Sequence, residues 1–208
     1  MATQLNAGAL PVPIQIVSQK NIAATLGADS IRQSLIAGGV GLIVVVFYMI
    51  LQYQLLGLIS VIGLAVYALI SATLYRLIPV TLTLPGLAGF ILSVGMAVDS
   101  NILIFERYKE ERRSGKPVTT ALELAFGRAW DSIKDANMAT VITGLVLFNP
   151  LNWSFLNSSG PVKGFAFTLL LGIAISLFTG VVVTRTLLRI FIRPTKTNVQ
   201  SKMLNLKS

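Results

Sequence analysis

The chain has 208 residues, of which 54 % are hydrophobic and only 12 % are charged, and its mean hydropathy is +0.75. Soluble domains carry about 25 % charged residues, so this composition indicates a membrane protein and excludes intrinsic disorder and collagen-like repeats. The sequence contains neither cysteine nor histidine, which removes disulfides, thiolates and the commonest general base and metal ligand. We therefore expect no enzyme, no catalytic residue, no metal and no cofactor.

Residues 1–32 are expected to be the remnant of an external, periplasmic domain. Apolar side chains alternate at Val12, Ile14 and Ile16, which predicts a short external β-strand. A single strand has no partner for its backbone, and residues 1–30 contain no apolar segment typical of a signal peptide. We therefore expect the chain to be the C-terminal part of a longer protein with an earlier membrane span.

Residues 33–193 are expected to form a membrane domain with five transmembrane helices. The stretch between Arg32 and Arg76 is uncharged and accommodates two helices of about 20 residues, the length that crosses a hydrocarbon core of about 30 Å. The polar step from Gln52 to Gln54 predicts a tight turn between them. The expected spans are 34–53, 55–75, a helix from Pro85 to about Phe105, 133–148 and 164–184.

The charged loop 106–132 separates the third expected span from the fourth. The Ser-Gly-Lys-Pro sequence at 114–117 predicts a break between helices. Thr120 and Glu123 have the spacing of a capping box, so a separate amphipathic helix at the membrane interface should follow. Its apolar face would be formed by Leu122, Leu124, Phe126 and Trp130.

The ends of the last two spans are also marked in the sequence. Asn149 and Pro150 predict the end of the fourth span, and Gly160 with Pro161 predicts a turn in the loop that follows. Residues 194–208 are expected to form a basic cytoplasmic tail.

Lysine and arginine are divided unequally between the two expected sides of the membrane. Seven lie in 106–134 and six lie from Arg185 onward, against four on the opposite side. Because basic loops are retained in the cytoplasm, we expect the loop and the C-terminus to be cytoplasmic and the N-terminus to be outside. The expected fold class is an all-α membrane protein with five transmembrane helices, a cytoplasmic amphipathic helix and a short N-terminal external strand. These basic loops also explain the net charge of +9 better than nucleic-acid binding does.

Asp99 is the candidate functional residue with the strongest physical argument. An ionised aspartate near the centre of a membrane helix costs about 2.5–3.5 kcal/mol, and such residues usually mark ion pathways. A carboxyl group in an apolar environment exchanges protons closer to neutral pH. The alternative is a merely hydrated side chain, because Glu106 and Arg107 begin the interface two turns later. We favour a proton-carrying role.

Asp135 and Asn137 form a second polar group at the start of the fourth expected span. They are either a relay or gate paired with Asp99, or a helix-start group stabilised by the helix dipole. The sequence contains no phosphate-binding loop, so an ion gradient or an external source must supply energy. One charge moving through 100 mV gives about 2.3 kcal/mol, which makes proton coupling physically adequate.

Three segments of the chain resemble the membrane half of the SecD/SecF family of bacterial protein-export subunits. They are GMAVDSNILIFERYKEE at 95–111, DANMAT at 135–140 and GPVKGFAFTLLLGI at 160–173. The family belongs to the resistance-nodulation-division superfamily, which includes proton-driven exporters. The resemblance implies one earlier span, a large periplasmic domain, five further spans and a proton relay at Asp99, Asp135 and Asn137. Ala139 stands where the family often has a threonine, which removes one hydrogen-bonding group.

The resemblance also implies a function and its partners. The chain would act with SecF beside the SecYEG channel in the bacterial inner membrane and use the proton gradient to aid translocation of polypeptides. YajC, SecA, the translocating polypeptide and membrane lipid are the further implied partners, and nucleic acid is not among them. A proton-coupled exporter of small molecules or lipids from the same superfamily is the alternative, and a structural membrane scaffold is a third. Coupling to sodium is left open.

Overall fold

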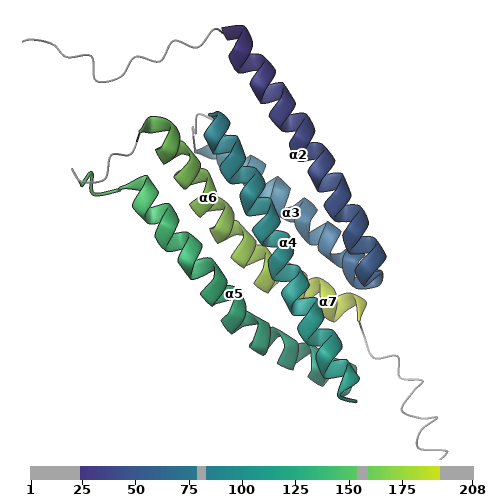
Figure 1. The fold of residues 1–208 in the computed structure, drawn as a ribbon. Coiled ribbons are helices and arrows are strands. Elements are labelled where there is room, and N and C mark those ends of the chain that lie inside the picture. Colours follow the sequence, from purple (N-terminus) through teal and green to yellow (C-terminus); the bar gives the residue numbers. More distant parts are fainter. Residues whose placement is uncertain (1–23, 79–82, 154–158, 193–208) are drawn as a thin grey trace, which may run out of the picture.

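The computed structural model describes residues 24–78, 83–153 and 159–192, and each regular element in these ranges is a helix (Figure 1). The helices are α2 (Ala24–Tyr53), α3 (Leu55–Leu77), α4 (Leu84–Arg113), α5 (Val118–Phe148), α6 (Gly160–Phe178), the π-helix η1 (Thr179–Thr184) and α7 (Arg185–Phe191). The last three follow one another without a break. The strand expected near residues 12–16 lies outside the described residues, as does the expected cytoplasmic tail, residues 194–208.

Four helical segments of the described residues are long and apolar enough to cross a membrane. They are Asp29–Tyr53, Leu55–Leu77, Leu84–Arg113 and Gly160–Phe191. These segments contain the first, second, third and fifth expected spans, which confirms four of the predicted helices. Each of the last two extends beyond its predicted limits, because nothing in the sequence breaks the helix where the apolar stretch ends.

Helix α5 differs from the prediction. Residues 118–148 form one continuous helix instead of an interfacial helix followed by a separate span, because no proline lies between Pro117 and Pro150. The expected fourth span, 133–148, is the second half of this helix. The first half carries three charged side chains, at Glu123, Arg128 and Asp131, and the start of the second half carries two more, at Lys134 and Asp135.

The first half of α5 is amphipathic, but two predicted details are wrong. The helix begins at Val118 with Pro117 at its N-cap, so Thr120 lies inside the first turn and does not cap it. Leu122 and Phe126 are buried as expected, whereas Leu124 and Trp130 are 38 % and 41 % exposed. The buried face instead follows the helical spacing of small residues and consists of Ala121, Leu122, Ala125, Phe126, Ala129 and Ile133.

The turns agree with the sequence in three of four places. Gln54 has a positive φ of 49° between α2 and α3, Gly115 has a φ of 79° between α4 and α5, and Asn149 ends α5 in the left-handed region. The prediction for Gly160 and Pro161 is wrong, because both residues belong to the first turn of α6. Proline suits that position, since its missing N–H has no partner in a first turn.

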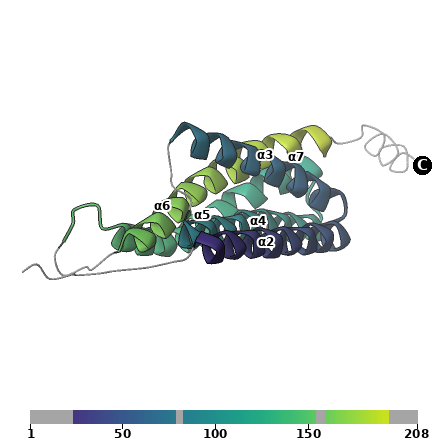
Figure 2. The same cartoon turned by 90° about the horizontal axis from the view of Figure 1, so that it is seen from above.

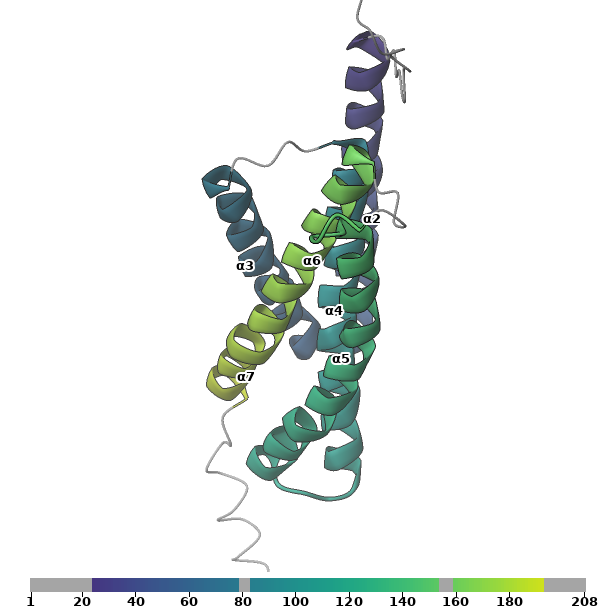
Figure 3. The ribbon, with the colours of Figure 1, turned by 90° about the vertical axis from the view of Figure 1, so that its left-hand side faces the viewer.

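Helix α4 is the centre of the bundle. It packs along α6 and α5 and also contacts α2 and α3. Seen from above, α2 lies beside α4, α3 lies with α7, and α6 crosses between them (Figure 2). The side view shows that the first half of α5 bends toward α7 (Figure 3). Helix α2 is the least covered, with only 6 % of its apolar window buried.

The loops collect at two ends of the bundle. In Figure 1 the α2–α3 turn, the α4–α5 loop and the end of α7 lie at one end, and the starts of α2, α4 and α6 lie at the other. The basic side chains of 107–134 and α7 therefore lie toward the first end. Arg32, Arg76 and Lys163 lie toward the opposite end, which is the grouping that the basic-residue count assumed.

Candidate functional site

Asp99 lies past the middle of α4 and points away from the bundle. Its side chain is exposed, while its neighbours Val98, Ser100 and Asn101 are buried. Asp99 forms no hydrogen bond or ion pair with any residue that the structure describes. This turn of α4 thus exposes the carboxylate of Asp99 and buries the three neighbouring side chains.

The other two predicted relay residues occupy different positions on α5. Asp135 is exposed and, within the described ranges, has no hydrogen bond or ion pair. Asn137 is buried and its side-chain amide donates to the carbonyl oxygen of Ile133, at 2.8 Å. Although α4 and α5 pack together, no hydrogen bond joins Asp99, Asp135 and Asn137 in the described part of the chain.

A buried polar bridge lies immediately behind Asp99. The Asn101 amide nitrogen donates to Ser60 Oγ of α3, and Thr184 Oγ1 of η1 donates to Asn101 Oδ1, each at 3.0 Å. The three residues are 4 %, 2 % and 0 % exposed, respectively. Burial of an unpaired polar group costs about 1–3 kcal/mol, so these contacts satisfy groups that would otherwise destabilise the bundle. Sequence analysis missed this bridge.

The segment that faces Ser100 and Asn101 is a π-helix. A methyl group added at Gly180 of η1 would lie 3.9 Å from Ser100 Cβ, so η1 runs directly past this turn of α4. π-Helices are rare and are frequently found at functional sites. The sequence signal for it was weak: a glycine followed by three valines, all of which have lower helix propensity than alanine or leucine.

Two further hydrogen bonds hold the inner face of α4. Tyr67 Oη and Ser93 Oγ are 2.7 Å apart, and Thr168 Oγ1 donates to the Gly86 carbonyl oxygen at 2.8 Å. Gly86, Ser93 and Asn101 are separated by about two helical turns each and therefore share one face. These contacts fix both the position of α4 and its rotation about its own axis.

The end of the bundle that carries the α4–α5 loop is held by ion pairs. Glu111 is buried and pairs with Lys116 and with Arg128, the latter at 2.5 Å. Glu123 of α5 accepts from Arg189 and Arg185 of α7, each at 2.5 Å. Hydrogen bonds from Arg189 and then Arg185 hold the pKa of the Glu123 carboxyl below its usual range.

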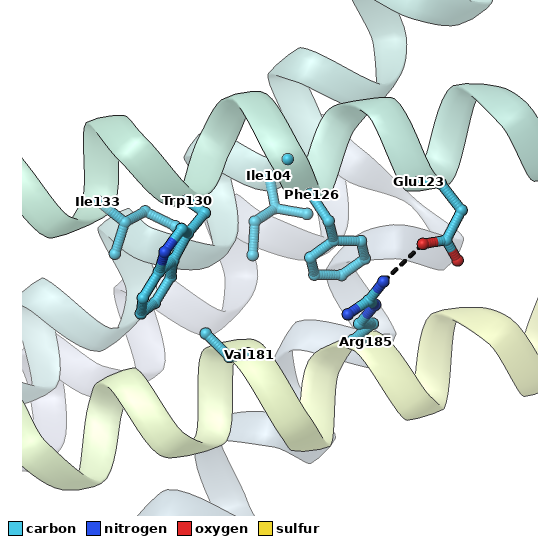
Figure 4. A pocket seen from close by; sticks show the side chains of 8 residues that line it. Ile104, Glu123, Phe126, Trp130, Ile133, Val181 and Arg185 are labelled. Carbon is cyan, nitrogen blue, oxygen red and sulfur yellow. Dashed lines mark hydrogen bonds and ion pairs between the residues drawn. The ribbon is translucent and has the colours of Figure 1, made fainter.

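A small pocket of about 330 Å³ lies beside the Glu123 ion pair. Figure 4 shows Arg185 directed at Glu123 next to the Phe126 ring, with Trp130 on the same helix facing Val181. The lining residues are Ile104, Glu123, Phe126, Gly127, Trp130, Ile133, Val181 and Arg185. The pocket separates the first half of α5 from η1 and α7. Within the described ranges, no cluster of three acidic, histidine or cysteine side chains is able to hold a metal ion.

Comparison with known proteins gives consistent matches over nearly the whole chain. Residues 3–193 match the family described as protein export membrane protein SecD/SecF, C-terminal. The chain is 47 % identical over 190 residues to the protein translocase subunit SecD of Thermobaculum terrenum, covering 91 % of this chain and 36 % of the relative. It is 48 % identical over 194 residues to the SecD subunit of Dehalococcoides mccartyi, covering 92 % and 42 %.

A solved structure gives the same result for the fold. The crystal structure of SecDF in its super-membrane-facing form matches with a TM-score of 0.73 and 35 % sequence identity, over 91 % of this chain and 26 % of that one. The chain spans about two fifths of the length of the SecD relatives described above.

Proposed function

This chain belongs to the SecD/SecF family of protein-export membrane proteins, and we propose that it acts as the membrane part of a SecD subunit that uses the proton gradient to aid polypeptide export. It is a multi-pass membrane protein of a family found in the cytoplasmic membrane. Its relatives are translocase subunits, which favours protein export over the export of small molecules or lipids and over a passive scaffold.

The observation that carries this proposal is the outward-facing carboxylate of Asp99. An acid is costly in a membrane helix and usually faces a bundle interior or water, yet Asp99 faces away from the other described helices. A partner subunit that covers this face would supply both the apolar environment and a cation to pair with it. SecF is the partner we propose, because the matching crystal structure is of SecDF and the matching family is described as SecD/SecF.

Asp135 and Asn137 have different proposed roles within the relay. Asp135 is exposed on α5 and so is available to a partner helix or to water at the membrane surface. Asn137 is buried with its amide bonded to its own helix, so it supports the α5 contact and leaves proton transfer to the two carboxylates. The SecYEG channel, YajC, SecA and a translocating polypeptide are further proposed partners of the full-length subunit.

We also propose that the second half of α5 is the remaining membrane span, the fourth in chain order. Residues 136–148 are uncharged, and α5 runs the length of the bundle beside α4 and α6. Its charged first half would lie at the cytoplasmic surface together with α7. This assignment places the N-terminus outside and the C-terminus in the cytoplasm.

The proton role is tested by Asp99→Asn in the full-length subunit assembled with SecF. This change keeps the shape of the side chain and removes its titration, so it should preserve assembly and abolish the stimulation of export by a proton gradient. The measurement is export of a precursor protein into membrane vesicles, with and without the gradient, at equal levels of the complex.

Two variants serve as matched controls. Asp131→Asn removes an exposed acid of α5 that pairs only locally with Lys134. Ser100→Ala removes the neighbouring hydroxyl, which donates to the Met96 carbonyl of its own helix. Both should keep the stimulation of the wild type. Full stimulation in the Asp99→Asn complex would exclude the proton role of Asp99.

A further inference from the structure

The polar bridge at Asn101 lies on the opposite side of α4 from Asp99. Residues two positions apart in an α-helix are related by a rotation of about 200° about the helix axis, so their side chains point to nearly opposite sides. Asn101 faces inward and bonds Ser60 and Thr184, while Asp99 faces outward. Any rotation of α4 that breaks the bridge therefore turns the Asp99 carboxylate by the same angle.

The side-chain amide of Asn101 both donates and accepts a hydrogen bond in this bridge. Its nitrogen donates to α3 and its oxygen accepts from η1, so one side chain connects three elements. Serine and threonine in helices commonly donate to a carbonyl of the preceding turn, as Thr179 does to Ile175. Thr184 donates instead to Asn101, across the helix interface.

One end of the bridge lies on the π-helix η1. Thr184 is the last residue of η1, and a π turn contains more residues than an α turn. Converting η1 to regular α-helix would rotate Thr184 relative to α6 and pull on Asn101. The bridge therefore connects the irregular part of the last helix to the helix that carries the acid.

We propose that Asn101 is a positioning residue for the proton step: through Ser60 and Thr184 it sets the rotation of α4 and thereby the direction of the Asp99 carboxylate. This inference rests on the proposed function, since it concerns the residue assigned there as proton carrier. Asn101 itself neither carries the proton nor contacts the partner subunit.

The test uses three variants in the full-length subunit assembled with SecF. Asn101→Leu keeps the side-chain volume and removes both hydrogen bonds. Thr184→Val keeps the shape of threonine and removes only the hydroxyl, so it disturbs folding less. Thr184→Ser retains the hydroxyl and should behave like the wild type. If Thr184 acted through packing alone, Thr184→Val would instead be closer to the wild type than Thr184→Ser.

Two measurements are made on each complex. The first is the stimulation of export by a proton gradient, which we expect to fall about tenfold in Asn101→Leu and Thr184→Val, because a buried hydrogen bond is worth on the order of a factor of ten in an equilibrium. The second is the pH at which dicyclohexylcarbodiimide, a reagent for protonated carboxyl groups, labels Asp99 half-maximally. We expect that midpoint to move by about half a pH unit or more as the surroundings of the carboxylate change.

The outcomes separate this inference from the proposed function. An unchanged labelling midpoint in both Asn101→Leu and Thr184→Val overturns the positioning role, even if export falls, because the effect is then on the fold alone. Unchanged export stimulation in both variants also overturns it. The Asp99→Asn complex serves as the blank for labelling, and its export result decides the proton role independently.

Discussion

Small residues along the inner face of α4 and α6 determine how closely the central helices approach. A methyl group added at Gly172 would overlap Ser93 and lie 3.0 Å from Tyr67 Oη, which are the two groups that form a buried hydrogen bond. A methyl group added at Gly39 of α2 would meet nothing within 4 Å. The same substitution therefore has opposite expected effects at the two sites.

We expect Gly172→Ala to lower the free energy of unfolding by about 1–3 kcal/mol, the usual cost of overpacking a core. Gly39→Ala should be neutral or stabilising by up to about 1 kcal/mol, because alanine has the higher helix propensity. Both values can be measured by unfolding the purified protein in mixed micelles. Equal stability of the two variants would contradict the close contact at Gly172.

Asp99 and Asn101 show which candidate site residues can be proposed from a sequence alone. Asp99 was predicted because the cost of a charge in an apolar helix is visible from its immediate neighbours. Asn101 was missed because an amide carries no charge, and its role depends on Ser60 and Thr184, which lie 41 and 83 positions away. These residues come together only when α3, α4 and η1 pack against one another.

At the scale of elements, the contact between α5 and α7 depends on the ionised form of Glu123. A carboxyl whose pKa is lower in the folded state stabilises the contact above its unfolded value of about 4.3, and this contribution is lost as the pH falls through the folded value. Because Glu123 is 46 % exposed, solvent screening limits the contribution to about 1 kcal/mol or less.

Trp130 reports on this contact because it lines the pocket between α5 and α7. In a Trp153→Phe background, which leaves Trp130 as the sole tryptophan, we expect its fluorescence emission to shift to longer wavelength as acid protonates Glu123, at a pH below the ordinary pKa of glutamate. Glu123→Gln should show the shifted emission already at neutral pH. Asp131→Asn is the control and should retain the wild-type transition, and a transition that persists in Glu123→Gln would show that another group is responsible.

The same helix explains one error in the predicted fold. The apolar lengths of α2, α3, α4 and α6 were sufficient to locate four membrane helices. In α5 the apolar stretch begins after the charges at Lys134 and Asp135, but the helix continues through that point because no residue interrupts it. The change from a charged to an apolar stretch was therefore mistaken for the boundary between two helices. The π-helix η1 was not predicted, because its sequence signal is weak: a glycine followed by three valines.

At the scale of the whole molecule, the distribution of basic residues and the arrangement of the helices lead to one topology. The seven lysines and arginines of residues 107–134 lie on α4, the α4–α5 loop and α5, and Arg185 and Arg189 lie on α7, which ends at the same end of the bundle as that loop. Basic segments of this kind stay in the cytoplasm. The end of α5 and the start of α6 lie at the opposite end, so the segment between them should be outside.

Single cysteines test this topology, because the natural chain has none. In cells that produce the full-length subunit, a membrane-impermeant thiol reagent should label Trp153→Cys in intact cells. It should label Arg112→Cys and Arg193→Cys only after the membrane is opened, with the cysteine-free parent as the background. Arg112 and Trp153 flank α5, so labelling of both from the same side would mean that α5 does not cross the membrane. Labelling of Arg112→Cys in intact cells, with Trp153→Cys protected, would instead mean that α5 crosses in the reverse direction and that the basic residues face outward.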